Sequence, residues 1–218
     1  MQVKDINLEA IIKRREDYSK RSIAIEGLNE TFEGELKAYE QMLSMINAPT
    51  TEFVSFFIDK IEKSDDTLDS DVAYTGEVKR ILKLLNPCIE YKSELELYDA
   101  FEKKYCSTPS ACSFFMIIDS KKIFSKKNNV FEKKEFESYV SGELAAYEEM
   151  LNDLDYEESI FFKKYKDTLD KNNELIEEEM DNHYDVFIQN NQNNEKMIGY
   201  DNAIAEILEL LKPESQFA

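Results

Sequence analysis

Apolar side chains recur every three to four residues over most of the chain, which is the pattern of amphipathic helices. In the clearest such stretch, residues 34–46, the apolar positions are Leu36, Tyr39, Met42, Leu43 and Ile46. Helices of the same kind are predicted over 7–24 and 51–66, so that each motif helix follows a partner in an αα-hairpin. For residues 156–192 we expect one long helix, and two helices broken at residues 171–173 are the alternative.

A ten-residue motif occurs twice with eight identical positions, as GELKAYEQML at 34–43 and as GELAAYEEML at 142–151. Shorter versions follow at 75–87 and 198–213, so four of the five glycines occupy one position of the motif. These glycines are Gly34, Gly76, Gly142 and Gly199. A glycine inside a helix costs about 1 kcal/mol relative to alanine. We therefore expect each of them to lie where a partner helix approaches closely.

Residues around the motif indicate where its helices begin and how closely they pack. A polar residue suited to the N-cap precedes each glycine. These residues are Asn29, Asp71, Ser138 and Asn194. Alanine follows the glycine by one turn in three copies, whereas the second copy has Arg80 there, so we expect looser packing in that copy. The chain is predicted to contain two related helical halves, 1–87 and 132–218, with duplication as their origin.

The segment between the halves, 88–131, has a different pattern. Residues 90–105 have helical spacing, and the sequence STPSA at 107–111 interrupts it. The two apolar runs on either side of the sequence DSKK predict two short strands over 112–129. The predicted fold class is therefore mainly α, with duplicated αα-hairpin halves and a small β-hairpin or extended insertion between them.

The charge balance narrows the choice of partners. The 218 residues have a formal net charge of −19, and 33% of the side chains are charged. Residues 101–134 contain eight lysines and three acids, whereas residues 135–181 contain sixteen acids and four bases. An acidic surface repels nucleic acid, and only four of the 27 basic residues are arginine. We therefore expect a protein partner and no direct binding of nucleic acid.

Patterns for catalysis and metal binding are scarce in this sequence. His183 is the single histidine, and with Glu179 one turn earlier it supplies only half of a metal site. A carboxylate-bridged di-iron site needs Glu-x-x-His pairs, which the spacing does not provide. Cys88, Cys106 and Cys112 lack a CxxC spacing, and neither a phosphate-binding glycine loop nor a GxSxG motif occurs. We expect no metal, no cofactor and no enzymatic activity, and we interpret the cysteines as small buried side chains.

The location of the protein is predicted from its apolar runs. No run reaches the roughly 18 residues of a membrane span. The N-terminal residues have charges within their apolar stretch and show no signal-peptide pattern. We therefore expect a cytosolic protein with no membrane association.

The two full copies of the motif resemble the terminal Gly-x-x-x-Ala-Tyr-x-x-Met/Val-Leu helix of small acidic proteins from phages and mobile elements of low-GC bacteria. The resemblance covers the motif helix of each copy, and the copy at 75–87 departs from it at Arg80 and Ile81. It implies a packing helix without catalytic residues and, for a phage-encoded protein, a location in the host cytosol. It also implies kinship with inhibitors of host defence nucleases, such as anti-CRISPR or anti-restriction proteins.

The acidic segments suggest how such an inhibitor would work. Carboxylates spaced by three and four residues on a rigid helix lie several ångströms apart, which is comparable to the spacing of phosphates along a nucleic acid. We predict a non-enzymatic decoy that occupies the basic channel of a nucleic-acid-binding complex, with charge steering the association. The candidate contact residues lie in 152–159 and 174–181. They are Asp153, Asp155, Glu157, Glu158, Glu177, Glu178, Glu179 and Asp181.

The alternative is a helical adaptor or scaffold protein. In that hypothesis the grooves between helix pairs, or the central hairpin, hold a partner peptide or a second copy of the chain as a homodimer. The lysines that would form its contact surface are Lys121, Lys122, Lys126 and Lys127. Binding through charge weakens steeply as ionic strength rises, whereas binding in a groove does not, so salt dependence separates the two hypotheses.

Overall fold

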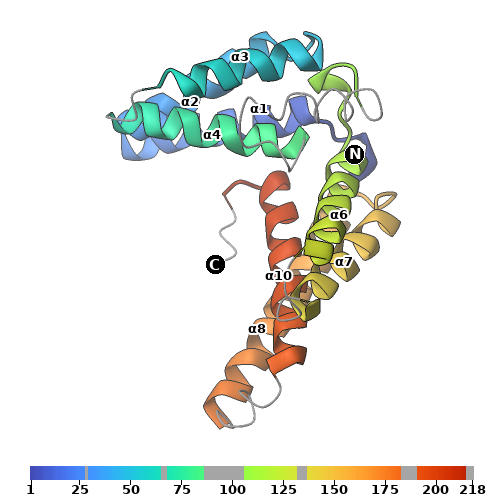
Figure 1. The fold of residues 1–218 in the computed structure, drawn as a ribbon. Coiled ribbons are helices and arrows are strands. Elements are labelled where there is room, and N and C mark those ends of the chain that lie inside the picture. Colours follow the sequence, from blue (N-terminus) through green and yellow to red (C-terminus); the bar gives the residue numbers. More distant parts are fainter. Residues whose placement is uncertain (28, 65–67, 86–105, 132–136, 183–190, 215–218) are drawn as a thin grey trace. The chain divides into compact units, whose positions relative to one another are not determined.

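A computed structural model describes residues 1–27, 29–64, 68–85, 106–131, 137–182 and 191–214. In these ranges the chain forms α-helices and two short 3-10 helices, η1 (Val3–Asp5) and η3 (Pro109–Ala111), without a strand (Figure 1). The helices are α1 (Leu8–Glu26), α2 (Glu30–Ser44), α3 (Thr50–Glu62), α4 (Asp69–Leu85), α6 (Phe114–Phe131), α7 (Glu137–Asn152), α8 (Glu158–Asn182) and α10 (Asn191–Leu211). The predicted mainly α class is confirmed.

Packing divides the chain into two compact units. One unit contains Asp5–Ser120, and the other contains Met1–Lys4 together with Lys121–Ala218. The boundary between them falls inside α6. None of the helices in the described ranges is long and apolar enough to cross a membrane.

In the unit Asp5–Ser120, α2 packs against both α1 and α4, and α3 packs against α4. The contact between α2 and α4 depends on Gly34. A Cβ atom at this position would lie against the carbonyl oxygen of Ser70 and 2.8 Å from its carbonyl carbon. Only glycine therefore lets the two backbones come this close, and the predicted close approach is confirmed here.

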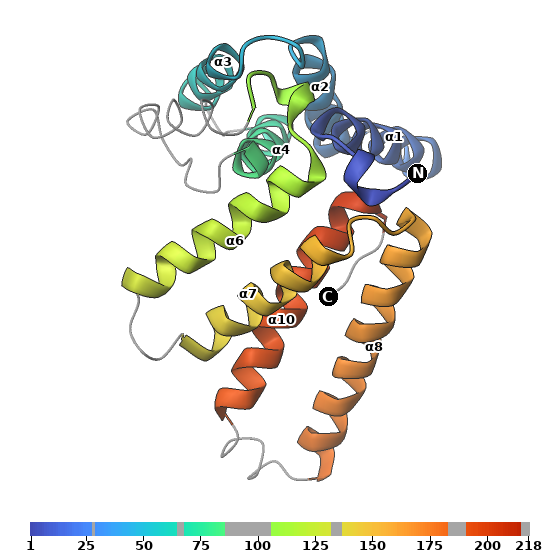
Figure 2. The same cartoon turned by 90° about the vertical axis from the view of Figure 1, so that its right-hand side faces the viewer.

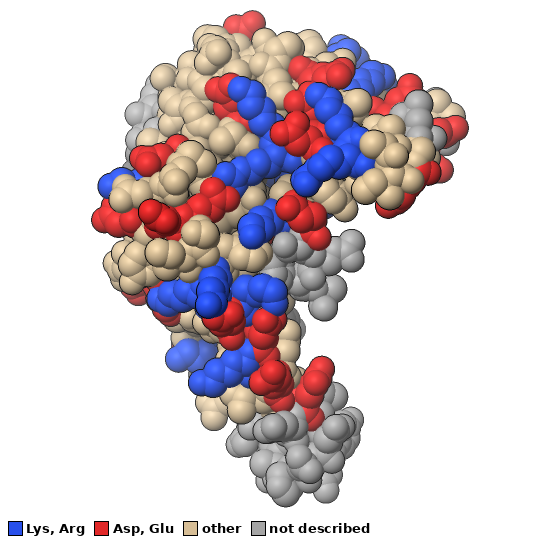
Figure 3. Space-filling model, turned by 180° about the vertical axis from the view of Figure 1, so that it is seen from behind, with Lys and Arg blue, Asp and Glu red and all other residues tan. Residues whose placement is uncertain are grey.

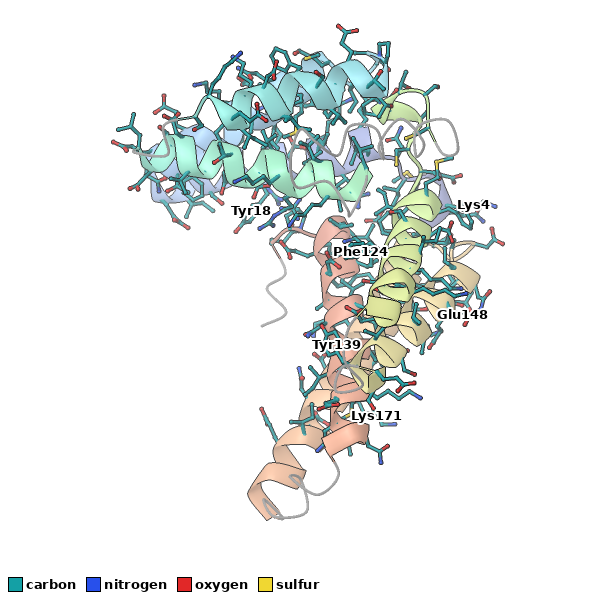
Figure 4. All side chains as sticks on the ribbon, in the orientation of Figure 1. Lys4, Tyr18, Phe124, Tyr139, Glu148 and Lys171 are labelled. Atoms are coloured by element: carbon teal, nitrogen blue, oxygen red, sulfur yellow. The ribbon has the colours of Figure 1, made fainter. Side chains whose placement is uncertain are left out.

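In the other unit, α10 packs along α7 and also against α8 (Figures 1 and 2). Two glycines face this crossing from opposite sides. A Cβ on Gly142 would lie 2.8 Å from the backbone nitrogen of Tyr200, and one on Gly199 would lie 2.8 Å from the carbonyl carbon of Tyr139, which is labelled in Figure 4. The predicted close approach is confirmed at both positions.

Gly76 does not lie at such a crossing. No atom lies within 4 Å of the position that its Cβ would occupy, so the prediction of a close contact is wrong at this residue. The reason is the alignment of the motif copies. When VAYTGEVKRILKLLNP (72–87) is matched to IGYDNAIAEILELLKP (198–213), Tyr74 matches Tyr200 and the residue matching Gly199 is Ala73. The close approach of α4 occurs earlier in the helix, at Ser70.

Helix starts agree with the predicted N-caps at one position of four. The side chain of Asn29 accepts a hydrogen bond from the backbone nitrogen of Phe32 at 2.9 Å, as an N-cap does. Asp71, Ser138 and Asn194 lie inside α4, α7 and α10 and are not caps. Each of these helices begins at least two residues earlier than the predicted N-cap implies.

The β-hairpin predicted over 112–129 is wrong, because residues 114–131 form the single helix α6. The buried positions Phe114, Ile117, Ile118, Lys121 and Ser125 follow a helical period, which the dense apolar run concealed. The hydroxyl of Ser113 accepts a hydrogen bond from the backbone nitrogen of Met116 at 3.4 Å and caps the first turn. The predicted helix over 90–105 lies outside the described residues.

The long helix predicted over 156–192 is observed as far as Asn182. Helix α8 is continuous through residues 171–173, where the alternative placed a break. Residues 183–190 lie outside the described part of the chain, and α10 begins at Asn191.

Candidate functional site

The acidic residues of the first candidate segment do not form one exposed surface. The carboxylate of Asp153 accepts hydrogen bonds from Lys164 Nζ at 2.5 Å and from the hydroxyl of Tyr165 at 2.7 Å. Its side chain is only 12% exposed. Asp153 therefore joins the α7–α8 turn to α8, and it is not available to a partner.

The rest of this segment holds the N-terminal residues of the chain. The backbone nitrogen of Glu158 donates to the carbonyl of Met1 at 3.0 Å, and Gln2 forms an isolated antiparallel bridge with Glu157. Asp155 forms an ion pair with Lys4, labelled in Figure 4, at 2.7 Å, and its side chain is 77% exposed. Such an exposed pair adds at most about 1 kcal/mol, so the Asp155 carboxylate can be recruited by another cation.

The second candidate segment is the C-terminal end of α8. Residues 174–181 contain five acids and no base. Because α8 is continuous here, positions 174, 177, 178 and 181 fall on one side of the helix. The side chains of Glu174 and Glu177 are exposed, whereas those from residue 178 to 182 lie outside the described atoms. His183 also lies outside the described residues.

The lysines proposed as an adaptor surface are partly internal. Lys121 is buried and forms an ion pair with Glu206 at 2.5 Å. Lys122 forms an ion pair with Glu148 at 3.2 Å, and Lys126 is exposed. The side chain of Lys127 lies outside the described atoms. Since Lys121 serves the interior of its unit, the four lysines do not form one contact surface.

Each unit has a cation, Arg15 or Lys121, whose burial the sequence analysis did not predict. In the unit Asp5–Ser120, Arg15 lies 3.7 Å from Glu77, which also accepts a hydrogen bond from the hydroxyl of Tyr39 at 2.7 Å. Burial and the neighbouring carboxylate raise the pKa of the Tyr39 hydroxyl, so it remains a donor at neutral pH. In the other unit, Lys121 pairs with Glu206, to which the Tyr147 hydroxyl donates at 3.4 Å. Both groups join helices.

A second internal network joins α7, α8 and α10 through Lys164. Its ammonium group lies 2.8 Å from Glu149 and 2.5 Å from Asp153. The Tyr200 hydroxyl donates to Glu149 at 2.5 Å. Burial opposes the ionisation of Glu149, but the hydrogen bonds from Lys164 and Tyr200 prevail and lower the pKa of its carboxyl group. The charged groups of this network are paired with one another, so we interpret the network as one that stabilises the packing of the three helices.

Asp201 is the one buried carboxylate of α10 with an unmatched oxygen among the described side chains. Asn172 of α8 donates to its Oδ1 at 2.7 Å, while no described donor reaches Oδ2. Burial raises the pKa of Asp201, although the Asn172 hydrogen bond acts in the opposite direction. This residue therefore reduces the stability of the folded state at neutral pH.

A pocket in the unit Asp5–Ser120 is lined by side chains of α2, α3 and α4 and of the residues that follow α3. Its volume is about 470 Å³. The lining residues are Lys37, Gln41, Phe56, Asp59, Lys60, Lys63, Ser64, Asp71 and Tyr74. The Tyr74 hydroxyl donates to Gln41 at 2.8 Å and fixes one wall. The sequence analysis did not find this pocket because its residues come from three helices and share no local pattern.

Metal-binding and thiol chemistry have little support in the described residues. Within these ranges no group of three or more His, Cys, Asp or Glu side chains is placed to hold a metal ion. Cys106 and Cys112 are both buried thiols, which confirms the interpretation for these two. A hydrogen bond with Cys106, followed by burial, raises the pKa of the Cys112 thiol, so it is a poor nucleophile. Cys88 lies outside the described part of the chain.

Charge is mixed on the face that Figure 3 shows, where acidic and basic side chains are interleaved. In the sequence, 174–181 is the clearest acidic segment. Comparisons with protein-family models, curated proteins and solved structures find no match for this chain.

Proposed function

We propose that this protein has no catalytic activity and acts by binding another macromolecule through the acidic end of α8. The observation that supports this proposal is the position of residues 174–181 on a continuous helix, with five acids and no base. Asp153 and Glu149, by contrast, both form ion pairs with Lys164. At the end of α8 the described carboxylates, Glu174 and Glu177, are exposed, and the sequence places no lysine or arginine among the acids of 174–181.

The geometry of this helix end suits a basic partner. With a rise of about 1.5 Å per residue, positions 174, 177, 178 and 181 span about 10 Å along the helix. A negative stripe of this length resembles a few successive phosphates of a nucleic-acid strand. The proposed partner is a nucleic-acid-binding complex, whose basic channel the stripe would occupy as a decoy. We also propose a cytosolic site of action, in the host cell if the protein is encoded by a phage and inhibits a defence nuclease.

The structure reduces the list of acidic residues that we propose to contact the partner. Asp153 is removed from it because Lys164 and Tyr165 hold its carboxylate. Asp155 and Glu157 are exposed and can contribute at the edge of the contact. The adaptor alternative loses its central hairpin, because that segment is α6. It retains the inter-helix pocket, but a volume of about 470 Å³ suits a small molecule better than a peptide.

We also propose that the chain arose by duplication of one four-helix repeat, with α1 to α4 matching α6, α7, α8 and α10, so that the second copy begins before the predicted half 132–218. Support comes from contacts at matching positions. The rings of Phe53 and Phe57 lie 4.7 Å apart at 55°, and those of Phe161 and Tyr165 lie 4.6 Å apart at 53°. The Tyr74 bond to Gln41 likewise matches the Tyr200 bond to Glu149.

The segment before the first helix of each proposed repeat bonds to the other repeat: 107–110 bonds to residues around the start of α3, and 1–4 bonds to residues around the start of α8. The backbone nitrogen of Thr50 donates to the carbonyl of Ser107 at 3.0 Å, and that of Glu158 donates to Met1 at 3.0 Å. A second pair of backbone hydrogen bonds also joins matching positions. The backbone nitrogen of Ser110 donates to the carbonyl of Ile46 at 3.0 Å, and that of Lys4 donates to the carbonyl of Leu154 at 3.0 Å. In the proposed duplication, the N-terminal segment of each repeat therefore packs with the helices of the other repeat. Met1–Lys4 accordingly belongs to the unit of Lys121–Ala218.

A pull-down at two salt concentrations tests the proposed binding. The tagged protein is incubated with lysate of its source or host cell at about 0.1 M and about 0.5 M salt, and bound proteins are identified by mass spectrometry. Recovery of a nucleic-acid-binding complex at low salt alone supports the decoy. A partner retained equally at both concentrations would rule out binding led by charge.

A further inference from the structure

The pocket between α2, α3 and α4 gathers positive charge in a protein that is otherwise strongly acidic. Lys37, Lys60 and Lys63 all line it, whereas the chain as a whole has a net charge of −19. Among the described residues, none of these three ammonium groups forms an ion pair. Three lysines around one cavity repel one another, so an anion that entered the pocket would relieve that repulsion.

Two aromatic rings lie beside these lysines. Lys37 Nζ is 5.8 Å from the centre of the Tyr74 ring, and Lys60 Nζ is 5.5 Å from the centre of the Phe56 ring. Phe56 is 37% exposed although it is a large apolar side chain. The pocket therefore offers a flat apolar surface as well as cations, which suits a ligand with both an aromatic ring and a negative group.

Two carboxylates also line the pocket, and they restrict the choice of ligand. Asp59 and Asp71 would repel a simple anion at their own positions, but a carboxylate readily accepts hydrogen bonds from sugar hydroxyl groups. A nucleotide has a phosphate for the lysines, a base for the rings and ribose hydroxyls for the acids. The volume of about 470 Å³ lies within the range typical of small-molecule sites.

The matching region of the second half shows that the shared helices do not require Lys37 or Lys60. These two residues are matched by Ala145 and Thr168, whereas Lys63 is matched by Lys171. Phe56 is matched by Lys164, whose ammonium group is neutralised by Glu149 at 2.8 Å and by Asp153 at 2.5 Å. In the pocket of the first half, by contrast, Lys37, Lys60 and Lys63 form no ion pair with a described residue.

We propose that the pocket formed by Lys37, Lys60, Lys63, Phe56 and Tyr74 binds a nucleotide. The lysines contact the phosphate groups as point charges, and the base packs against the exposed ring of Phe56. Asp71, in the first turn of α4, accepts a hydrogen bond from the ribose. This site lies in the unit Asp5–Ser120 and does not involve the acidic end of α8. The experiments below therefore test nucleotide binding independently of the proposed decoy function.

Calorimetric titration of the full chain tests the proposal, with ADP, adenosine and pyrophosphate as probes. We expect saturable binding of ADP with a Kd below about 1 mM and at least roughly ten-fold weaker binding of adenosine and of pyrophosphate. Absence of saturable ADP binding below about 1 mM would overturn the proposal. Equal affinity for pyrophosphate and ADP would also overturn it, because the rings would then have no role.

Variants locate the site. Lys37→Ala, Lys60→Ala and Lys63→Ala combined should weaken ADP binding at least about ten-fold, since three charge-assisted contacts are lost. The matched control removes three exposed lysines of α8, at 163, 166 and 171, and should leave the affinity within about two-fold. Equal loss in both variants would show a general charge effect and overturn the assignment.

Phe56→Ala separates the base from the phosphate. The side chain is partly exposed, so its removal should leave the unit folded, as checked by circular dichroism. ADP affinity should fall at least about three-fold while that of pyrophosphate stays unchanged, because only the base contacts the ring. An unchanged ADP affinity in this variant would refute the stacking and, with it, the choice of a nucleotide.

Discussion

Replacing Gly142 by alanine tests the packing of α7 against α10 most sharply. The new Cβ would meet only backbone atoms, including the nitrogen of Tyr200 at 2.8 Å and the carbonyl carbon of Lys196 at 2.9 Å. Carbon atoms in contact normally lie about 3.5–4.0 Å apart. The two backbones would therefore have to separate by about 1 Å along the crossing, since no flexible side chain can move away instead.

The expected loss follows from two opposing effects. Overpacking of a close contact costs about 1–3 kcal/mol, and alanine gains about 1 kcal/mol over glycine in a helix. We expect Gly142→Ala to lower the free energy of unfolding by up to about 2 kcal/mol, or Tm by up to several degrees. Gly76→Ala is the matched control, because its Cβ would meet nothing within 4 Å. It should raise the free energy of unfolding by up to about 1 kcal/mol.

Urea denaturation followed by circular dichroism measures both variants. The two substitutions are chemically identical and both lie in helices, so a difference in sign reports only the local packing. Equal stabilisation by Gly142→Ala and Gly76→Ala would refute the close crossing and with it the explanation for the repeated glycine.

Further predictions concern buried polar groups. Asp153→Ala should cost about 1.5–3 kcal/mol because it removes two hydrogen bonds to a charged group, whereas Asp155→Ala should cost less than about 1 kcal/mol, as chemical denaturation would measure. Asp201→Asn should stabilise the protein at pH 7 but not near pH 3. Folding raises the pKa of this carboxyl group, so its cost is absent below the unfolded pKa and grows as pH rises; melting curves at both pH values check this. Thiol titration at pH 8 should detect Cys106 and Cys112 only after unfolding.

The helices could be predicted from the sequence because their apolar positions are regular. The stripe of 34–46 corresponds to α2, and the packing role of Gly34, Gly142 and Gly199 followed from the cost of glycine in a helix. The prediction for Gly76 was wrong because the second copy of the motif was aligned so that Gly76 matched the glycines of the other copies. The packing instead matches Tyr74 with Tyr200, which shifts the crossing.

Two features depended on tertiary context. The run at 114–118 is apolar on consecutive residues, so a buried helix and a strand look alike until the fold shows that Lys121 is buried and paired with Glu206. The candidate site was limited in the same way. Asp153 and Asp155 are equivalent in the sequence pattern, yet only the fold shows that Lys164 holds the first and leaves the second exposed. The division of the chain at 87 and 131 and the inhibitor function stay predictions.

The most direct test of the central claim compares three proteins in the low-salt pull-down. The first is the wild type, and the second has Gln or Asn at the four acids of one helix face, 174, 177, 178 and 181. The third has the same four-charge change at the exposed acids 17, 26, 30 and 40 of the first half. The account predicts that only the second variant loses the nucleic-acid-binding complex. Equal recovery by all three, or equal loss in both variants, would contradict a contact at the end of α8.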